Sequence, residues 1–362
     1  MQQFQVKRSR FSDHRVNEGN NGDSLQAGEV TARVERFAFT ANNITYAAAG
    51  DMIGYWKFFP PIGKDTEEWG VIPVWGFAEI TASNTKGVQV GDRLFGYWPP
   101  ADTIHMKPVK VSEHSFIDGS EHRAELPIGY NVYRFADKAG SNDVTADNER
   151  SLLYPLFLTG FLIWDALQEV SWHGAKQIVV LSASSKTSLG LAYAIKEDEN
   201  APPTVGMTSA GNVDFVKSLG VYNSVLSYDD FAALNASTPT TIVDMAGNSE
   251  LLGKLHKHFG DNMKFCQNVG LTHWDATTPN PDVIAERSEF FFAPGQMQKR
   301  MKDWGPKGFE ETVTSFVLRS AKACRSWLAV KELHGLDALD AIYESVCNGS
   351  ANPAEGIVIK MS

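Results

Sequence analysis

The chain has 362 residues, 43% of them hydrophobic and 21% charged, which is enough for two folded domains with substantial cores. Its formal net charge of −10 makes the average surface repel nucleic acids and anionic lipids, so neither is expected as a partner. Cys266, Cys324 and Cys347 show no CxxC spacing and are typical of buried thiols in a reducing compartment. The polar start lacks the pattern of a secretory signal, and we expect a cytoplasmic protein.

The first 110 residues carry strand patterns and glycine-rich loops. About thirty residues of polar lead-in precede residues 30–39, whose alternating apolar and polar side chains predict a half-buried strand. Further strands are predicted at 71–80 and 88–97, around glycine turns. No helix longer than about two turns is expected in this region. The pattern indicates a β-rich domain.

From residue 148 the pattern changes to strands that alternate with helices. A helix over 151–170 is followed by a strand at 177–181 and a helix at 189–196. Further short strands are predicted at 204–207, 224–226, 241–244 and 263–268, with a helix ending at 219–220. This alternation indicates a doubly wound parallel sheet. The most apolar stretch, 152–167, is too short to cross a bilayer, so no membrane partner is expected.

The C-terminal part is predicted to be helical over 309–331 and 336–346 and to close with a strand at 356–360. Before it, the run 289–293 contains Phe290, Phe291 and Phe292 and resembles an edge strand that aggregates unless it is paired.

Residues 177–196, QIVVLSASSKTSLGLAYAIK, have the pattern of a strand, a small polar turn and a helix start. Most glycines of a dinucleotide fingerprint are missing, but small side chains, several hydroxyls and Lys186 favour a phosphate ligand near the helix N-terminus. An ordinary capped turn explains the serines and threonines equally well. A phosphate loop of an NTPase requires a GxxxxGK spacing, which the sequence lacks.

Several short motifs follow one another along the chain: Asn43-Ile44-Thr45-Tyr46 with Gly50, Gly91-Asp92-Arg93, Leu158-Thr159, Phe215 to Gly220, Val225 to Tyr228, Asp244 to Gly247, and Gly356 to Ile359. In kind and order these motifs resemble those of the medium-chain dehydrogenase/reductase superfamily, and the chain is most similar to its zinc-independent, quinone-reductase-like branch. More narrowly, the chain resembles a bacterial family catalogued only as a domain of unknown function.

This resemblance implies an α/β fold with two domains. A GroES-like β-rich catalytic domain would comprise residues 1–150 and be completed by 310–362, and a Rossmann domain with a doubly wound parallel sheet would comprise 151–309. Zinc-dependent relatives place a Cys early in the catalytic domain, whereas no Cys precedes Cys266 here. Clustered thiolates for a structural zinc are also missing, and we expect no metal.

The resemblance places a dinucleotide over the turn after the first strand of the Rossmann domain. Its candidate ligands are Ser184, Ser185, Lys186, Thr187, Ser188, Leu189 and Gly190, joined by Tyr228 and Gly247. The first acid after the second strand is Asp214, inside a helix, which favours NADP over NAD. Thr208 and Ser209 would then bind the 2′-phosphate. Two alternatives stay open: a merely polar turn, and a loop that no longer binds dinucleotide.

Tyr46 is the candidate proton donor, since the corresponding segment faces the nicotinamide in the resembled family. Asn43 and Thr159 would position the substrate or the nicotinamide carboxamide. The alternatives are a core tyrosine, a turn residue and a helix-packing residue. An unusual aromatic content suggests an apolar, ring-lined substrate cleft, contributed by Trp56, Phe58, Phe59, Trp75, Tyr97 and Trp98.

The sequence therefore predicts a zinc-independent, NADPH-dependent oxidoreductase that reduces a small apolar carbonyl, enone or quinone. The alternative is a non-catalytic reductase-like scaffold that binds a ligand or partner, because the glycine fingerprint is eroded. Relatives join edge strands into one continuous sheet, and we expect a homodimer.

Overall fold

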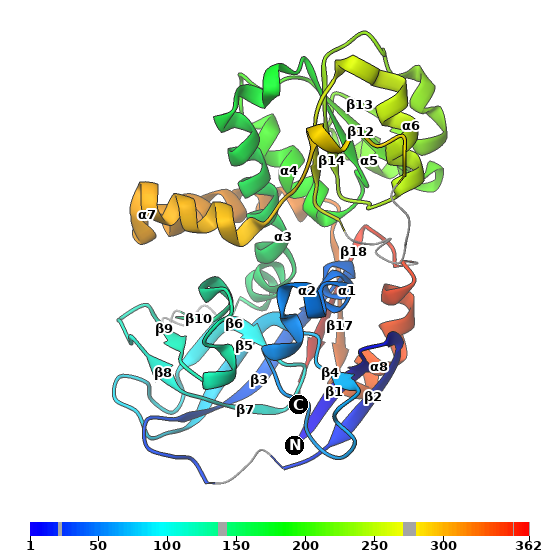
Figure 1. Cartoon of the computed structure of the whole chain (residues 1–362). Coiled ribbons are helices and arrows are strands. Elements are labelled where there is room, and N and C mark those ends of the chain that lie inside the picture. The colour runs from blue at the N-terminus through cyan, green and yellow to red at the C-terminus, as the bar shows by residue number, and fades with distance from the viewer. Residues whose placement is uncertain (21–23, 137–142, 271–279, 350, 362) are drawn as a thin grey trace. The chain divides into compact units, whose positions relative to one another are not determined.

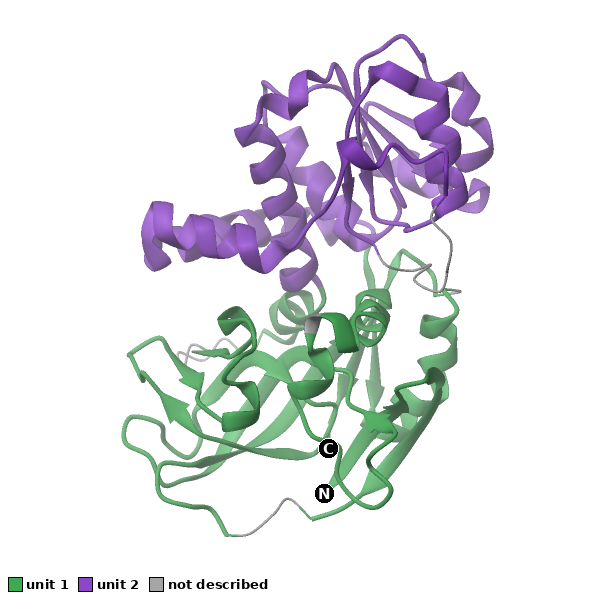
Figure 2. Cartoon of the chain, viewed as in Figure 1, with its two compact units in different colours: residues 1–152, 328–362 green, residues 153–327 purple. Residues whose placement is uncertain are grey.

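The computed structural model describes residues 1–20, 24–136, 143–270, 280–349 and 351–361 (Figure 1). The chain divides into two compact units (Figure 2). Unit 1 comprises residues 1–152 and 328–362, and unit 2 comprises residues 153–327. The second boundary lies at residue 328 rather than at the predicted 310, because helix α7 (Ala293–Cys324) packs against α4 (Lys186–Lys196) within unit 2.

The first residues of unit 1 form strands, and the prediction of a polar lead-in is wrong. Strand β1 (Gln2–Lys7) pairs antiparallel with β2 (Arg10–Glu18) and with β4 (Trp69–Gly70). Phe4 and Val6 are two residues apart, so both point to the same face of β1, where they are fully buried. This period of two within a mostly polar segment is what makes it a strand.

The main sheet of unit 1 has nine strands, in the order β17-β18-β3-β5-β6-β10-β9-β8, with β7 paired to β3. Residues up to Lys331 were predicted to be helical, but β17 is a strand that pairs parallel with β18. The strands are β3 (Val30–Phe39), β5 (Val74–Ser83), β6 (Arg93–Trp98), β7 (Thr103–Met106), β8 (Pro108–Val109), β9 (Ser115–Asp118), β10 (Val132–Phe135), β17 (Ala329–His334) and β18 (Glu355–Lys360).

Among the described residues before 136, the helices beside this sheet are short. They are α1 (Ala41–Ala48), α2 (Gly50–Ile53) and the 3-10 turns η1 (Tyr55–Lys57), η2 (Glu121–Arg123) and η3 (Ile128–Tyr130). Helix α8 (Gly335–Cys347) belongs to the C-terminal part of the unit and contacts β1 and β2. Unit 1 is therefore rich in strands and includes a C-terminal segment of the chain.

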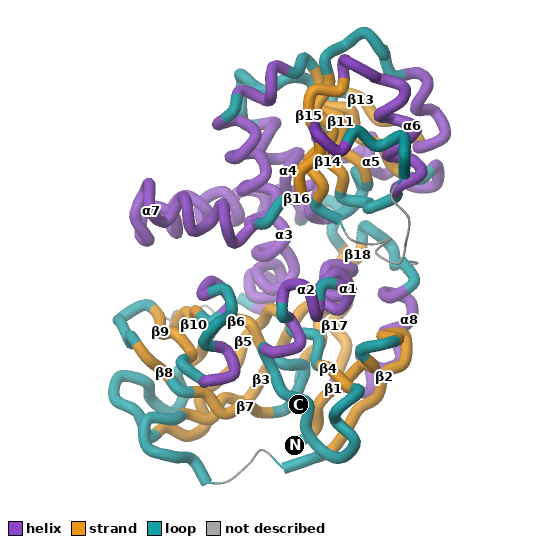
Figure 3. The backbone as a smooth tube through the Cα atoms, in the orientation of Figure 1, coloured by secondary structure: helices purple, strands orange, loops and turns teal. Residues whose placement is uncertain are grey.

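Unit 2 contains a six-stranded parallel sheet in the order β13-β12-β11-β14-β15-β16, and Figure 3 shows its strands between helices. This is a doubly wound sheet, as predicted. Its strands are β11 (Gln177–Leu181), β12 (Thr204–Thr208), β13 (Ser224–Ser227), β14 (Thr240–Asp244), β15 (Met263–Asn268) and β16 (Ser288–Phe290). The remaining helices are α3 (Val144–Glu169), α5 (Val213–Leu219) and α6 (Ser249–Phe259), with the 3-10 turn η5 (Ala210–Asn212).

Two glycines set how closely helices α3 and α4 approach. A Cβ at Gly160 would lie 2.4 Å from the Leu191 nitrogen, and one at Gly190 would lie 2.9 Å from the Phe157 Cα, so neither position has room for a side chain.

Helix α3 is long and apolar enough to cross a membrane, but 67% of its most apolar 18-residue stretch is buried, as in the core helix of a globular protein.

Candidate functional site

The turn after β11 holds its first residue in an unusual backbone conformation. Ser182 has φ +57°, a left-handed value that glycine adopts more readily than serine. Three residues later Ser185 caps helix α4, because its Oγ accepts a hydrogen bond from the Ser188 N–H over 3.2 Å. The turn therefore combines a left-handed serine with a capped helix start, and helix N-termini are favourable places for an anion.

Four of the seven predicted loop residues are buried and build the turn itself. The Ser184 hydroxyl accepts hydrogen bonds from Thr208 Oγ1 at 3.1 Å and Asn212 Nδ2 at 3.3 Å. The Ser188 hydroxyl donates to the Leu181 carbonyl at 3.3 Å. The other two buried positions are Leu189 and Gly190, the latter in contact with Phe157 as described above. Only Ser185, Lys186 and Thr187 of this set are half-buried and partly open to solvent.

Two tyrosines on either side of β13 support the turn: Tyr222 precedes that strand and Tyr228 directly follows it. The Ser182 N–H donates to the Tyr228 hydroxyl at 3.1 Å, and the Tyr222 hydroxyl lies 3.2 Å from the carbonyl oxygens of both Ala183 and Ser188. Burial raises the pKa of both phenols, so each stays neutral. Sequence reasoning missed Tyr222, because no local pattern signals a contact 39 residues away in sequence.

The remaining predicted cofactor residues follow the ends of β12 and β14. Thr208 is buried and its hydroxyl is used within the fold, whereas Ser209 is exposed at the start of η5. Asp244 Oδ1 accepts hydrogen bonds from the N–H groups of Ala246 at 2.8 Å and Gly247 at 3.0 Å. Gly247, with φ +65°, therefore shapes a tight turn and its amide is already bonded.

The three predicted catalytic residues fall in different units. In unit 2, Thr159 Oγ1 donates to the Pro155 carbonyl at 2.9 Å, within its own helix. In unit 1, Asn43 Oδ1 accepts from the Thr40 N–H and Asn43 Nδ2 donates to the Pro73 carbonyl, both at 2.8 Å. Both ends of the Asn43 amide therefore hold the start of α1, as in the turn-residue alternative.

Tyr46 lies on α1 within a group of aromatic rings. Its ring centroid is 4.7 Å from that of Tyr55 and 5.7 Å from that of Tyr97. Burial raises the pKa of the Tyr46 phenol, and nearby Tyr130 raises it further. Tyr46 is therefore neutral at physiological pH, so it is able to donate a proton or a hydrogen bond but not to act as a base.

The aromatic residues predicted to line a substrate cleft are buried throughout unit 1. Several pack on Tyr97, whose ring centroid lies 5.2 Å from those of Phe58 and Trp75.

Within the described residues, no three or more His, Cys, Asp or Glu side chains are placed to hold a metal ion. Among the described residues, none of the three cysteines forms a disulfide.

Comparisons with known proteins place the chain in a family. The family model described as "Protein of unknown function (DUF2855)" matches residues 37–352. A search of curated proteins gives no match. Among solved structures, CurA from Vibrio vulnificus in complex with NADPH has a TM-score of 0.66 at 12% identity, covering 100% of this chain and 99% of that chain.

Two further structures are similar over the whole chain. The yhdH oxidoreductase from Salmonella enterica in complex with NADP gives a TM-score of 0.54 at 17% identity, with 100% of both chains covered. The quinone oxidoreductase from Coxiella burnetii gives 0.57 at 12% identity, covering 100% of this chain and 99% of that chain. At such identities the likeness concerns the fold, and it confirms the predicted GroES-like and Rossmann architecture. The chain belongs to the DUF2855 family and has the fold of medium-chain reductases.

Proposed function

We propose that the protein is a zinc-independent, NADPH-dependent oxidoreductase that reduces a small apolar carbonyl, enone or quinone. The observation that carries this proposal is the Ser185-capped start of α4, directly after β11 at the carboxyl edge of a parallel sheet. Helix N-termini at this edge favour phosphate groups, because their amides and partial positive charge point outward. The similar folds of CurA and yhdH, solved with NADPH and NADP, support the choice of cofactor.

The residues of the turn divide into supporting and binding groups in this proposal. The buried hydroxyls of Ser184, Ser188 and Thr208 hold the backbone, since each is bonded within the fold. Lys186 and Thr187 lie in the first turn of α4 and are partly open to solvent, so we assign them to the phosphates. Exposed Ser209, at the end of the second strand, is assigned to the 2′-phosphate.

Unit 1 would supply the proton. The nicotinamide cofactor, when bound, supplies the hydride. The neutral Tyr46 phenol then gives its Oη proton to the oxygen of the substrate, and the surrounding rings exclude water. Asn43 positions α1, and through it Tyr46, because its side chain fixes the first turn of that helix.

We further propose that the protein forms a homodimer through β16. This strand ends the sheet of unit 2, and Phe290 and Phe292 beside its end are 45% and 42% exposed. An exposed apolar strand edge is stable when another strand pairs with it. A second copy provides the same edge, so the pairing would be symmetric. A cytoplasmic location remains a prediction, since the cysteines of the described residues form no disulfide.

One observation favours a non-catalytic ligand-binding scaffold as the second candidate function. Several donors of the turn are already used internally, including the Ser182 N–H and the Ser184 hydroxyl. A turn satisfied in this way keeps its shape without a ligand.

Titration with NADPH, NADH and ATP, followed by tryptophan fluorescence, separates the two candidate functions. The oxidoreductase proposal expects quenching by NADPH, weaker quenching by NADH and none by ATP. A panel of carbonyls and quinones with NADPH, monitored by the loss of its absorbance, then tests turnover. Binding of panel compounds without any binding of NADPH would support the scaffold instead.

A further inference from the structure

Four tyrosines of unit 1 gather from four separate elements: Tyr46 from α1, Tyr55 from η1, Tyr97 from β6 and Tyr130 from η3. We call them the tyrosine cluster. Ring centroids lie 4.7 Å apart for Tyr46 and Tyr55 and 4.8 Å apart for Tyr97 and Tyr130. The cluster brings four phenol groups into one apolar region, where each hydroxyl needs a hydrogen-bond partner.

The hydroxyl of Tyr97 lacks such a partner. The hydroxyls of Tyr55 and Tyr130 bond to each other at 3.0 Å. Tyr97 is fully buried, and its Oη has no hydrogen-bond partner among the residues that the structure describes. A buried hydroxyl without a partner destabilises the folded protein, and so this one calls for an explanation.

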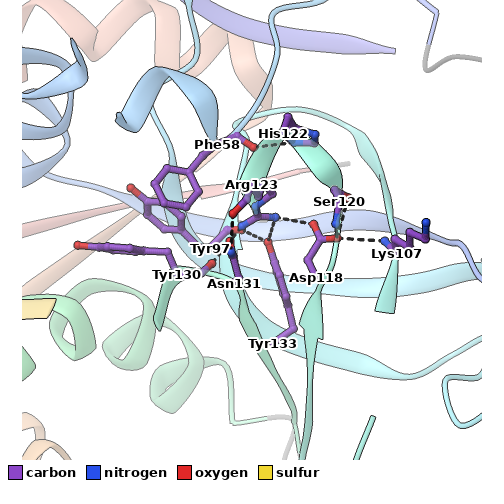
Figure 4. Close-up of polar contacts among 10 residues, drawn as sticks. All are labelled: Phe58, Tyr97, Lys107, Asp118, Ser120, His122, Arg123, Tyr130, Asn131 and Tyr133. Carbon is purple, nitrogen blue, oxygen red and sulfur yellow. Dashed lines mark hydrogen bonds and ion pairs between the residues drawn. The ribbon is translucent and has the colours of Figure 1, made fainter. Parts of the chain in front are cut away.

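The unpartnered hydroxyl does not result from loose packing, because a buried ion pair fixes the surrounding backbone. Arg123 and Asp118 pair at 2.6 Å with both side chains almost completely buried. Arg123 also donates to the Tyr130 carbonyl at 3.1 Å and to the Tyr133 hydroxyl at 2.9 Å. The Tyr133 hydroxyl in turn donates to the Tyr97 carbonyl. Figure 4 shows this network, with the Tyr97 and Tyr130 rings beside it.

Other aromatic rings lie between the Tyr97 ring and solvent. The Tyr97 ring contacts Tyr46 and Trp75, which are each 6% exposed, and Tyr130, which is only half-buried. Because Arg123 holds the Tyr130 carbonyl, the backbone there stays in place when the Tyr130 ring rotates. Such side-chain rotations are common when a ligand binds. The proposed route of access to the Tyr97 hydroxyl is rotation of this ring.

We propose that the Tyr97 hydroxyl is a hydrogen-bond donor for the carbonyl oxygen of a planar, conjugated ligand. Burial raises the pKa of Tyr97, which keeps the phenol protonated and able to donate. The flat rings around it favour a planar partner, and Asp118 balances the charge of Arg123, so nothing in this network favours an anion. That the ligand is also the substrate rests on the proposed function.

A site built around a buried donor selects strongly against an analogue that lacks the acceptor. The test uses α-tetralone, whose carbonyl is conjugated with a flat aromatic ring, and tetralin, the hydrocarbon of similar shape. Their dissociation constants are measured by ligand-observed NMR without nucleotide, for the wild type and for Tyr97→Phe. We expect Tyr97→Phe to raise the dissociation constant of α-tetralone about tenfold and to change that of tetralin less than about twofold.

Thermal unfolding provides a second, ligand-free measurement. Tyr97→Phe removes an unpartnered hydroxyl, so its unfolding midpoint should equal or exceed that of the wild type. Tyr133→Phe is the matched control: it removes a hydroxyl with two partners and should lower the midpoint. A lowered midpoint in Tyr97→Phe, unchanged α-tetralone binding in it, or no α-tetralone binding by the wild type would overturn the proposal. Selective α-tetralone binding alongside a failed NADPH titration would instead refute only the proposed function.

Discussion

The backbone N–H of Ser182 donates to the hydroxyl of Tyr228 over 3.1 Å, and this bond supports the one strained residue of the turn after β11. Serine at φ +57° is less stable than glycine, which occupies such positions without steric cost. The tyrosine therefore offers a physical reason why the turn persists without its glycine. It also ties the end of β13 to the turn, because Tyr228 directly follows that strand.

The first prediction concerns this hydrogen bond. Tyr228→Phe leaves the Ser182 N–H without its acceptor and should lower the free energy of unfolding by about 1–2 kcal/mol. NADPH affinity should fall as well, since the turn loses its support. Urea unfolding and a fluorescence titration measure the two effects. Adding Ser182→Gly should restore part of the stability, and unchanged stability in Tyr228→Phe would show that the bond is unimportant.

The second prediction concerns Lys186, in the first turn of α4. Lys186→Ala should weaken the binding of NADPH about tenfold more than the binding of NADH, because we assign the charge of Lys186 to the phosphates, including the 2′-phosphate. Lys196→Ala is the control: Lys196 lies at the opposite end of the same helix, with its Nζ bonded to the Gly220 carbonyl. Equal losses for both nucleotides in Lys186→Ala would place Lys186 on the pyrophosphate instead.

The sequence predicted strands best where the spacing of hydrophobic residues and the order of elements along the chain point to the same structure. Strand β3 and strand β11 match their predicted bounds, because alternation and a β-branched run are strong local signals. The β1–β2 hairpin was missed since its buried apolar residues, such as Phe4 and Val6, are few among polar neighbours. The first three residues of β17, up to Lys331, were predicted as helix; the side chains of this strand are mostly exposed, and the strand pairs with β18.

The candidate site was harder to predict, since the type of a residue does not reveal where its side chain points. Ser184 and Ser188 have the right chemistry for a phosphate, yet both hydroxyls point into the fold. Gly190 was read as a fingerprint glycine, and in the structure its lack of a side chain serves the contact with Phe157. Tyr222 acts through a contact with a segment 39 residues away, which a single sequence does not display.

The third prediction concerns Tyr46. Tyr46→Phe keeps the ring contacts with Tyr55 and Tyr97 but removes the proposed proton donor. Turnover with NADPH should fall by about a hundredfold or more, while NADPH affinity changes little. Steady-state kinetics and a fluorescence titration distinguish the two quantities. An undiminished kcat would exclude Tyr46 from the proton transfer.

The fourth prediction concerns the edge of the sheet in unit 2. Phe290→Asp with Phe292→Asp places two charges beside β16 and should convert the proposed dimer to a monomer. Light scattering after size-exclusion chromatography gives the mass directly. Val90→Asp, at an exposed apolar residue of unit 1, is the control and should leave the mass unchanged. A monomeric wild type would contradict the proposed assembly at once.

The fifth prediction concerns the pH dependence of stability. His256 is buried in α6, its Nδ1 accepts a hydrogen bond from the Ile284 N–H at 2.9 Å, and burial lowers its pKa to about 4. An unfolded histidine has a pKa near 6.5, so between these values the unfolded chain binds more protons than the folded protein. The contribution of His256 to the free energy of unfolding is therefore complete above about pH 6.5 and decreases as the pH falls, by about 2 kcal/mol at pH 5.

Urea unfolding at pH 7.5 and pH 5 measures this loss. His256→Asn keeps an acceptor near the Nδ1 position without titrating, and it should lose less stability than the wild type over the same interval. An equal loss in both proteins would assign the pH dependence to other groups.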